Sequence, residues 1–408
     1  MLESTMTLSR LMTTMFASVL PLANAQPPSF AVLDTAIDRA IEHGRIVGAV
    51  VLVAHEGEIV FRRAAGFADR EQGRPMREDA IFRLASVTKP IVSATVLRLV
   101  EQGKMDLQEP VTRWLPQFQP RMPDGSAPQI TIHQLLTHTA GLSYGFLEPM
   151  DGPYRRAGVS DGLDAQLTLE ENLRRIAGVP LAYAPGTGWH YSVALDVLGA
   201  AMQASAGNGL AELVRQEVTD PLDMRDTGFR VIDAGRLVTP YQDGNPEPVR
   251  MPAVAEVPYA QASIRFRLDN ATTQSGYPSA GAGMSGTALD FMRFLLSLRA
   301  NSPHRLLNQE TIAAMMQAPV GQQAQTQGPG WGFGYGWSVL VDPQLAGTPQ
   351  GRGTIQWGGV YGHSWFFDPV HDIAVVALTN TAIEGMAGDF PIAVRDAVYR
   401  ALKDVLPR

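Results

Sequence analysis

Residues 82–101 read FRLASVTKPIVSATVLRLVE, and this stretch carries both a helix pattern and a reactive pair. From Ser86 to Glu101 apolar residues fall on nearly every side of the predicted helix, which Gly103 ends. A helix that is apolar all round is buried in the centre of a large domain. Ser86 and Lys89 stand three residues apart, so they share one face of its first turn. The stretch therefore predicts a buried central helix that presents a serine beside a lysine.

This pair is suited to nucleophilic chemistry. A serine hydroxyl is a weak nucleophile that needs a neighbouring base. Burial in an apolar helix would lower the pKa of Lys89 from its ordinary value of about 10.4 and make a neutral amine available. Lys89 is one of three lysines, with Lys104 and Lys403, among 33 basic residues. Arginine, which supplies the rest, does not lose its proton in proteins. The competing interpretation is an N-cap serine beside a solvated lysine.

The composition describes a globular protein of two or three domains, or of one large interleaved unit. The chain has 408 residues, of which 45% are hydrophobic and 18% charged, and these values exclude disorder and coiled coil. Cysteine is absent, which excludes disulfides, thiolate metal sites and a cysteine nucleophile. The net charge of -7 argues against nucleic acid as a partner, because neutralising phosphates needs a basic face.

The first 25 residues resemble a targeting segment. Arg10 precedes the apolar stretch 11–22, which ends in small residues at 23–25. A positive start, a short apolar core and a small-x-small end are typical of a secretory signal peptide. We therefore expect cleavage after Ala25 and a periplasmic or secreted protein that has no membrane contact once cleaved. The alternative is a disordered N-terminus on a cytosolic enzyme.

The remaining chain is strand-rich at both ends and helix-rich in the middle. Residues 47–54 and 59–65 are apolar runs joined by a turn that contains Gly57, which predicts a β-hairpin. Residues 243–258 hold four prolines and are predicted to be a loop. Helices are expected over 31–44, 168–178, 192–206 and 390–405, and strands over 334–340, 354–357, 364–367 and 373–380. Separation of the strand-rich ends implies that they meet in one sheet.

Four motifs in order resemble the serine β-lactamase and penicillin-binding-protein-like superfamily. FRLASVTK at 82–89 looks like its nucleophile motif, and TIHQLLTHTAGL at 131–142 is similar to a second signature. YSV at 191–193 resembles the Tyr-Ser-Asn that supplies a catalytic tyrosine, and WGG at 357–359 stands where relatives carry Lys-Thr-Gly. With GVYGHSWF at 359–366, the combination looks like the family VIII carboxylesterases of the EstB type.

The resemblance implies a β-lactamase-like α+β fold, with an antiparallel sheet flanked by helices and an inserted helical domain. We expect residues 26–100 and 270–408 to form the sheet domain and residues 101–269 the helix-rich domain. The active site would lie between them, where pockets commonly form.

The same resemblance implies roles for individual residues. Ser86 would be the nucleophile, with Lys89 and Tyr191 as the base pair, and the sequence leaves open which of them takes the serine proton. The backbone N–H groups of Ser86 and Val360 would form the oxyanion hole. Substrate would contact Tyr144, Trp357, Gly358 and Gly359.

Several other side chains near these motifs have two interpretations. Three aromatic residues are expected either to line the pocket or to pack in the core, with the core favoured: Phe146, Trp189 and Trp365. His363 would support the loop that follows the oxyanion strand. His133 and His138 are expected to be turn and packing residues rather than ligands.

Two departures from the motifs favour esters. Val193 replaces the usual Asn, an amide that faces the substrate's amide side chain in β-lactamases. Trp357 replaces the Lys whose charge meets the carboxylate of a β-lactam. An aromatic wall favours a neutral, apolar acyl or alcohol group instead. The predicted function is therefore a serine carboxylesterase that hydrolyses short-chain esters through an acyl-enzyme.

Other mechanisms fit the sequence less well. Gly-x-Ser-x-Gly occurs at 141–145 and 158–162, but neither segment joins a predicted strand to a predicted helix, which is the context of a nucleophile elbow, and the segments 283–287 and 362–366 both miss the last Gly. No His-Glu-x-x-His motif or phosphate-cradling Gly loop occurs, so no metal or organic cofactor is implied. A β-lactamase, a D-amino-acid peptidase or an acyltransferase on the same residues remain alternatives, as does a non-catalytic binding or sensor protein. The sequence does not determine the oligomeric state.

Overall fold

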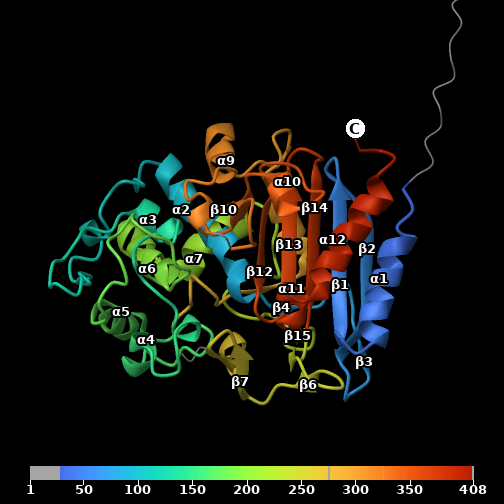
Figure 1. Cartoon of the computed structure of the whole chain (residues 1–408), viewed down its shortest axis with the longest axis horizontal. Coiled ribbons are helices and arrows are strands. Elements are labelled where there is room, and N and C mark those ends of the chain that lie inside the picture. The colour runs from blue at the N-terminus through green and yellow to red at the C-terminus, as the bar shows by residue number, and fades with distance from the viewer. Residues whose placement is uncertain (1–27, 274–275, 325, 407–408) are drawn as a thin grey trace, which may run out of the picture.

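One eight-stranded antiparallel sheet organises the computed structural model, which describes residues 28–273, 276–324 and 326–406 (Figure 1). The predicted signal segment, residues 1–25, lies outside the described residues. In spatial order the strands are β10 (Trp331–Phe333), β11 (Ser338–Leu340), β12 (Ile355–Gly359), β13 (His363–Asp368), β14 (Ile373–Thr379), β1 (Gly48–His55), β2 (Glu58–Asp69) and β3 (Arg74–Pro75).

The two strand-rich ends of the chain meet at the centre of this sheet. β1 pairs with β14 along its length, from Ala49 opposite Thr379 to His55 opposite Ile373. Nearly every residue of both strands is buried, because helices cover both faces of the sheet. The expectation that the N- and C-terminal strands form one sheet is therefore confirmed.

The predicted hairpin joins β1 to β2. Glu56 and Gly57 have positive φ values of 53° and 91°, which matches a two-residue turn of the type that suits twisted strands. A Cβ at Gly57 would also lie 2.2 Å from Arg299 Nη1, so the guanidinium would have to move, and the positive φ favours glycine in any case.

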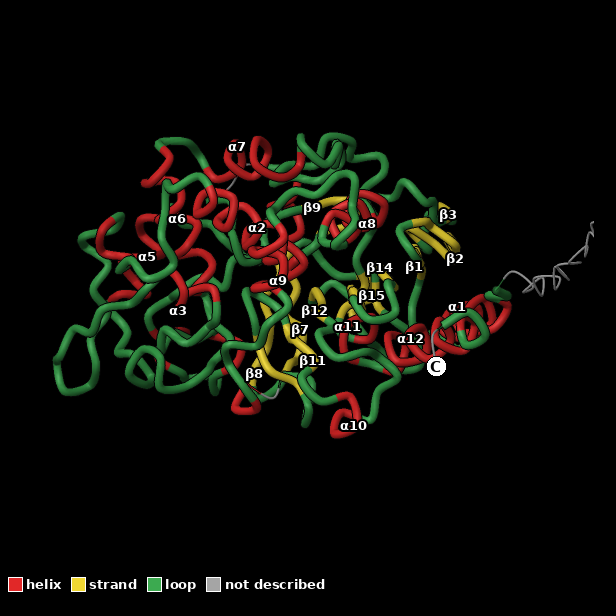
Figure 2. The backbone as a smooth tube through the Cα atoms, turned by 90° about the horizontal axis from the view of Figure 1, so that it is seen from above, coloured by secondary structure: helices red, strands yellow, loops and turns green. Residues whose placement is uncertain are grey.

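Helices cover the sheet on both sides (Figure 2). α1 (Ala31–Glu42) and α12 (Asp389–Leu402) pack together on one face, where they bury an apolar layer against β1 and β14. α8 (Ala288–Ser297) lies on the opposite face against the same two strands, and α2 (Thr88–Glu101) lies on that side too, toward the helix-rich half.

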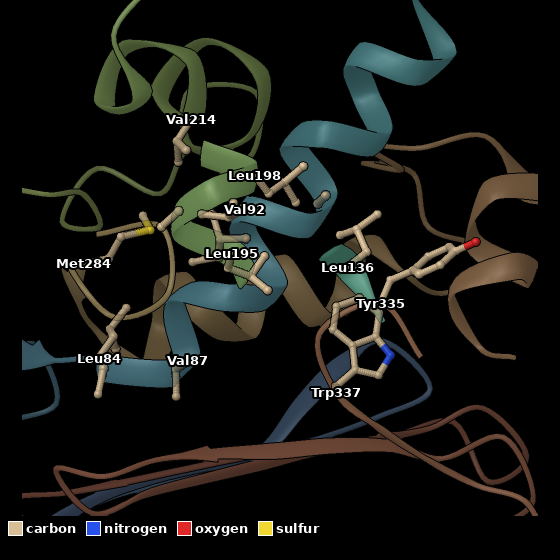
Figure 3. Close-up of a cluster of buried hydrophobic side chains, with 14 of the residues drawn as sticks. Leu84, Val87, Val92, Leu136, Leu195, Leu198, Val214, Met284, Tyr335 and Trp337 are labelled. Atoms are coloured by element: carbon tan, nitrogen blue, oxygen red, sulfur yellow. The ribbon is translucent and has the colours of Figure 1, made fainter. Parts of the chain in front are cut away.

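Helix α2 is the central helix that the sequence predicts. Eleven of its fourteen residues are buried, and it contacts α6 (Ala194–Ala206) and α7 (Leu210–Val214). Figure 3 shows Val92 of α2 beside Leu195 and Leu198 of α6. α3 (Ile132–Leu136) and α5 (Leu169–Ala177) complete this helical half. The predicted domain limits at residues 101 and 269 stay a prediction.

Shorter elements connect these layers. They are β4 (Phe82–Arg83), α4 (Pro153–Arg156), β5 (Tyr241–Gln242), β6 (Val249–Arg250), β7 (Val254–Tyr259), β8 (Ala262–Arg267), β9 (Ser285–Gly286), α9 (Gln309–Met315), α10 (Pro343–Ala346), β15 (Thr381–Ala382) and α11 (Glu384–Ala387).

Two sequence predictions differ from the structure. Of the strand expected over 334–340 only residues 338–340 are strand β11, because residues 334–337 form the turn from β10, in which Gly336 has a φ of 98°. The loop expected over 243–258 contains β6 and most of β7, which pairs with β8 in an isolated two-stranded sheet. Pro258 is tolerated there because β7 has an unpaired edge.

Candidate active site

The nucleophile candidate Ser86 lies in a short 3-10 turn, η1 (Ala85–Val87), directly before α2. The preceding Ala85 is fully buried and has a φ of 45°, a left-handed conformation that costs an alanine about 1–2 kcal/mol. The pairing of β4 with β9 and a hydrogen bond from the Leu84 N–H to the Met284 carbonyl hold this turn in place. The surrounding fold thus maintains a strained turn at the serine, as is common at functional sites.

Lys89 is completely buried one helical turn after the serine. Its Nζ lies 3.2 Å from Ser86 Oγ and donates a 2.8 Å hydrogen bond to the Gly281 carbonyl. Burial lowers the pKa of Lys89 to about 7, and the negative charge of Asp196 acts in the opposite direction. A substantial share of the amine is therefore neutral at neutral pH, as the sequence predicted.

Tyr191 comes from the loop before α6 and completes the group. Its hydroxyl donates to Ser86 Oγ at 2.8 Å, and Trp357 Nε1 lies 3.4 Å from the same hydroxyl. Lys89 Nζ lies 4.5 Å from the centre of the Tyr191 ring. Burial raises the pKa of Tyr191 above its ordinary value, so the phenol is neutral in this arrangement. The structure brings together the three residues that the sequence analysis selected.

Strand β12 approaches the serine turn very closely. A Cβ at Gly359 would lie 2.5 Å from the Leu84 carbonyl oxygen, and one at Gly358 would lie 2.5 Å from Met386 Cγ. Both positions therefore need glycine, and Val360 follows them at the edge of the same cavity as Ser86. Gly358 lines this cavity, whereas Gly359 faces the serine turn instead.

His363 ties β13 to the segment before the serine turn, whereas the sequence predicted support of the loop after the oxyanion strand. Its Nε2 lies 2.8 Å from the Arg83 carbonyl oxygen, and its ring packs edge-on against Phe82. Burial lowers the pKa of His363 to about 4, so the imidazole is neutral and Nε2–H donates. This bond connects the strand that carries Val360 to the segment that carries Ser86.

The cavity in front of Ser86 has a volume of about 660 Å³ and extends along β12 to the first turn of α12. Its lining near the serine is mostly aromatic: Phe146, Trp189, Tyr191, Tyr259, Trp331 and Trp357. The polar side chains that line it include Thr326, Gln327, Thr348 and Gln356. An apolar cavity with a few polar groups suits a small organic substrate.

The aromatic predictions are partly corrected by these positions. Tyr144 is not among the described residues that line the cavity, because it is buried behind Tyr191, with the two ring centres 5.0 Å apart. Phe146 and Trp189, for which the core was favoured over the pocket, both line the cavity, and Phe146 also belongs to the buried core. Trp365 packs against Phe291 in the core and also borders the cavity.

The histidines of the second motif pack as expected. His138 is fully buried, its ring centre lies 4.9 Å from that of Tyr191, and its Nδ1 lies 3.0 Å from Ser192 Oγ. His133 packs edge-on against Tyr335. Among the described residues no three histidine or carboxylate side chains are placed to hold a metal ion, and no described helix has the length and apolar character of a membrane span.

Sequence reasoning missed three residues of this site. Gly281 supplies the carbonyl acceptor for Lys89, and Asp196 accepts the Gly281 N–H at 3.0 Å. Tyr259, at the end of β7, lines the cavity. One available signal was Asp196 itself, because an acidic residue in an otherwise apolar helix needs a buried partner.

Comparisons with known proteins agree with this fold. A family model described as Beta-lactamase matches residues 33–398. The chain belongs to the beta-lactamase family.

Individual relatives place the chain more narrowly within this family. Esterase EstB from Burkholderia gladioli is 55% identical over 371 residues, which cover 90% of this chain and 94% of that protein. The solved structure of EstCE1, described as a hydrolase with promiscuous acyltransferase activity, has 46% sequence identity and a TM-score of 0.88 and covers 90% of this chain and 98% of that one. Simvastatin synthase from Aspergillus terreus, at 22% identity and a TM-score of 0.71 over 92% of this chain and 98% of that one, shares the fold. The resemblance to EstB-type proteins is confirmed.

Proposed function

We infer that the protein is a serine carboxylesterase that hydrolyses short-chain esters through an acyl-enzyme on Ser86. The observation that carries this conclusion is the position of Ser86 Oγ, within hydrogen-bond reach of both Lys89 and Tyr191 at the edge of an aromatic cavity. The 55% identity to Esterase EstB over 90% of the chain supports the same reaction class.

Lys89 is the better proton acceptor of the two candidates. Its pKa lies near 7, so the neutral amine is available, whereas the raised pKa of Tyr191 disfavours a phenolate. In the first step Ser86 Oγ transfers its proton to Lys89 and attacks the ester carbonyl carbon. The Tyr191 hydroxyl then relays the proton to the departing alkoxide as the ester C–O bond breaks.

Hydrolysis of the acyl-enzyme uses the same groups in reverse. A water molecule transfers a proton toward Lys89, attacks the acyl carbon and displaces Ser86 Oγ, which regains its proton. Negative charge on the carbonyl oxygen would be stabilised by the N–H groups of Ser86 and Val360. The products are an alcohol and a carboxylic acid.

Acyl transfer to an alcohol is a second candidate reaction. EstCE1 is described as a hydrolase with promiscuous acyltransferase activity. An alcohol that enters the aromatic cavity would replace water in the second step and release a new ester, with no change in the residues used.

We expect a p-nitrophenyl ester of a C2–C6 acid to be turned over at least about a hundredfold more efficiently than benzylpenicillin. A penicillin carries a carboxylate, and Trp357 cannot offer it a charge-assisted hydrogen bond, a contact of about 1.5–3 kcal/mol. Val193 is fully buried and offers no amide to the penicillin side chain. Each 1.4 kcal/mol lost is about tenfold. The measurement is kcat/KM for both substrates on one preparation.

A penicillin value within tenfold of the best ester would reverse this assignment in favour of a β-lactamase. Weak hydrolysis of a chromogenic cephalosporin agrees with the proposal, because the strained ring is intrinsically reactive.

We also propose that the chain is exported and cleaved after Ala25. The support is the apolar segment 11–22 with small residues at 23–25. Expressed with its full N-terminus in a Gram-negative host, the protein should be recovered from the periplasm with Gln26 as its first residue, as determined by mass spectrometry of the intact chain. An uncleaved periplasmic chain, or protein found only in the cytoplasm, would contradict export.

A further inference from the structure

We propose that Asp196 is a positioning residue for Lys89, which it serves both by holding the loop that binds the amine and by supplying the negative charge that faces it. The proposal rests on the role of Lys89 in the proposed function. It assigns a task to a buried carboxylate that the reaction itself does not use.

The carboxylate organises the loop 277–283 through three donors. Asp196 Oδ1 accepts the Ser279 hydroxyl at 2.8 Å and the Gly281 N–H at 3.0 Å, and Oδ2 accepts the Tyr277 hydroxyl at 2.9 Å. The Gly281 carbonyl in turn accepts the 2.8 Å hydrogen bond from Lys89 Nζ. Gly281 therefore links the two side chains, because its N–H donates to the carboxylate and its carbonyl accepts from the amine.

The two charged groups also lie close together across this glycine. A Cβ at residue 281 would be 3.6 Å from Lys89 Nζ and 3.7 Å from Asp196 Oδ1, so one methyl group would contact both. The same methyl would lie 2.9 Å from the Tyr144 hydroxyl. Both the lysine and the carboxylate are buried, so bulk solvent screens their interaction only weakly.

Among the described residues around Lys89, Asp196 is the acidic group whose negative charge acts on the amine. The other titratable groups around the amine are Tyr144 and Tyr191, whose pKa values burial raises, and His138, whose pKa burial lowers. All three are therefore neutral at neutral pH. On the loop side Tyr277 is neutral for the same reason as the other tyrosines.

This arrangement opposes the effect of burial on the lysine. Desolvation lowers the pKa of Lys89 to about 7, and the Asp196 charge raises it from the still lower value that burial alone would produce. A buried carboxylate is itself disfavoured, and burial raises the pKa of Asp196, but three hydrogen-bond donors favour its charged form. Removing the charge should therefore make the lysine easier to deprotonate and a weaker base.

The chain permits a direct test, because Lys89, Lys104 and Lys403 are its only lysines. Protein labelled with ¹³C at the lysine ε-carbon gives three resonances, and the one lost in Lys89→Arg identifies Lys89. We expect Asp196→Asn, which conserves volume and keeps an acceptor for Gly281, to move the Lys89 titration about one pH unit lower. The acidic limb of kcat/KM for a p-nitrophenyl ester should move in the same direction.

Asp290→Asn is the matched control. Asp290 is also a buried carboxylate, but it accepts from the Asp226 N–H and the Thr227 hydroxyl near the start of α8. Its replacement should leave the Lys89 titration unchanged. A Lys89 titration that is the same in Asp196→Asn as in the wild type, or that moves equally in Asp290→Asn, would overturn the proposed charge effect.

A second variant tests the loop if Asp196→Asn does not fold. Ser279→Ala removes one hydrogen bond to the carboxylate but keeps its charge, so we expect a lower kcat with little change in KM. Unchanged kcat in Ser279→Ala would contradict the positioning role. Because the NMR titration needs no substrate, absence of esterase activity in the wild type would refute the proposed function without deciding the placement of Asp196.

Discussion

Replacement of Ser86 by alanine should abolish turnover of p-nitrophenyl esters and leave the fold intact. The change removes one half-buried hydroxyl that accepts hydrogen bonds from Lys89 and Tyr191, and no other described group occupies its position between them. Without Oγ no acyl-enzyme can form, so the rate should fall to that of the uncatalysed reaction. Turnover by purified variant protein is the measurement, with circular dichroism to verify the fold.

Ser364→Ala is a suitable control for this experiment. Ser364 lines the same cavity and lies in the segment 362–366 that approaches a Gly-x-Ser-x-Gly motif without completing it. This variant should keep its esterase activity, and a fluorophosphonate should label it as it labels the wild type. Activity above a few per cent in Ser86→Ala, or an adduct mapped to another serine, would remove Ser86 as the nucleophile. Lack of any adduct would favour a binding protein.

Lys89→Arg should lower kcat by at least about a hundredfold, the smaller end of the usual effect of general-base catalysis. Arginine keeps the positive charge but does not release its proton, and its larger planar group must fit where Lys89 is completely buried. The wild-type kcat/KM should fall as pH decreases through about 7, because Lys89 is then protonated and cannot accept the serine proton. Stopped-flow measurement across pH checks both statements.

Two variants separate loss of the base from crowding. Lys89→Met has similar length and no charge, and it should be impaired at least as strongly as Lys89→Arg. Lys104→Arg, at a position beyond the end of α2, should behave as wild type. Near-normal turnover with arginine at position 89 would mean that a positive charge alone is sufficient.

Local patterns predicted the elements that support the site. The apolar run of α2, the turn at Gly57 and the four motifs each depend on residues close together in sequence, so each could be recognised without coordinates. The burial and lowered pKa of Lys89 followed from the same run, since a side chain in a helix that is apolar all round has no route to water.

What the sequence did not predict depends on contacts between distant residues. Lys89 and Gly281 are 192 positions apart, and no periodicity identifies which carbonyl receives the amine. Tyr144 follows the second motif closely, yet its ring lies behind Tyr191 because Phe146 and Tyr191 occupy the positions nearer the cavity. Tyr259 escaped notice because the prolines around it suggested a loop, although its strand has a free edge that accommodates proline.

The pairing of β1 with β14 has a consequence for biosynthesis. Residue 49 lies opposite residue 379, so a ribosome must complete nearly the whole chain before β1 gains this neighbour. Until then the nascent chain presents an apolar strand with an open edge, which is prone to aggregate and slow to find its distant partner. Truncation before residue 373 would leave the sheet divided at its centre. The centre of the sheet can therefore form only after the strands from both ends of the chain have been synthesised.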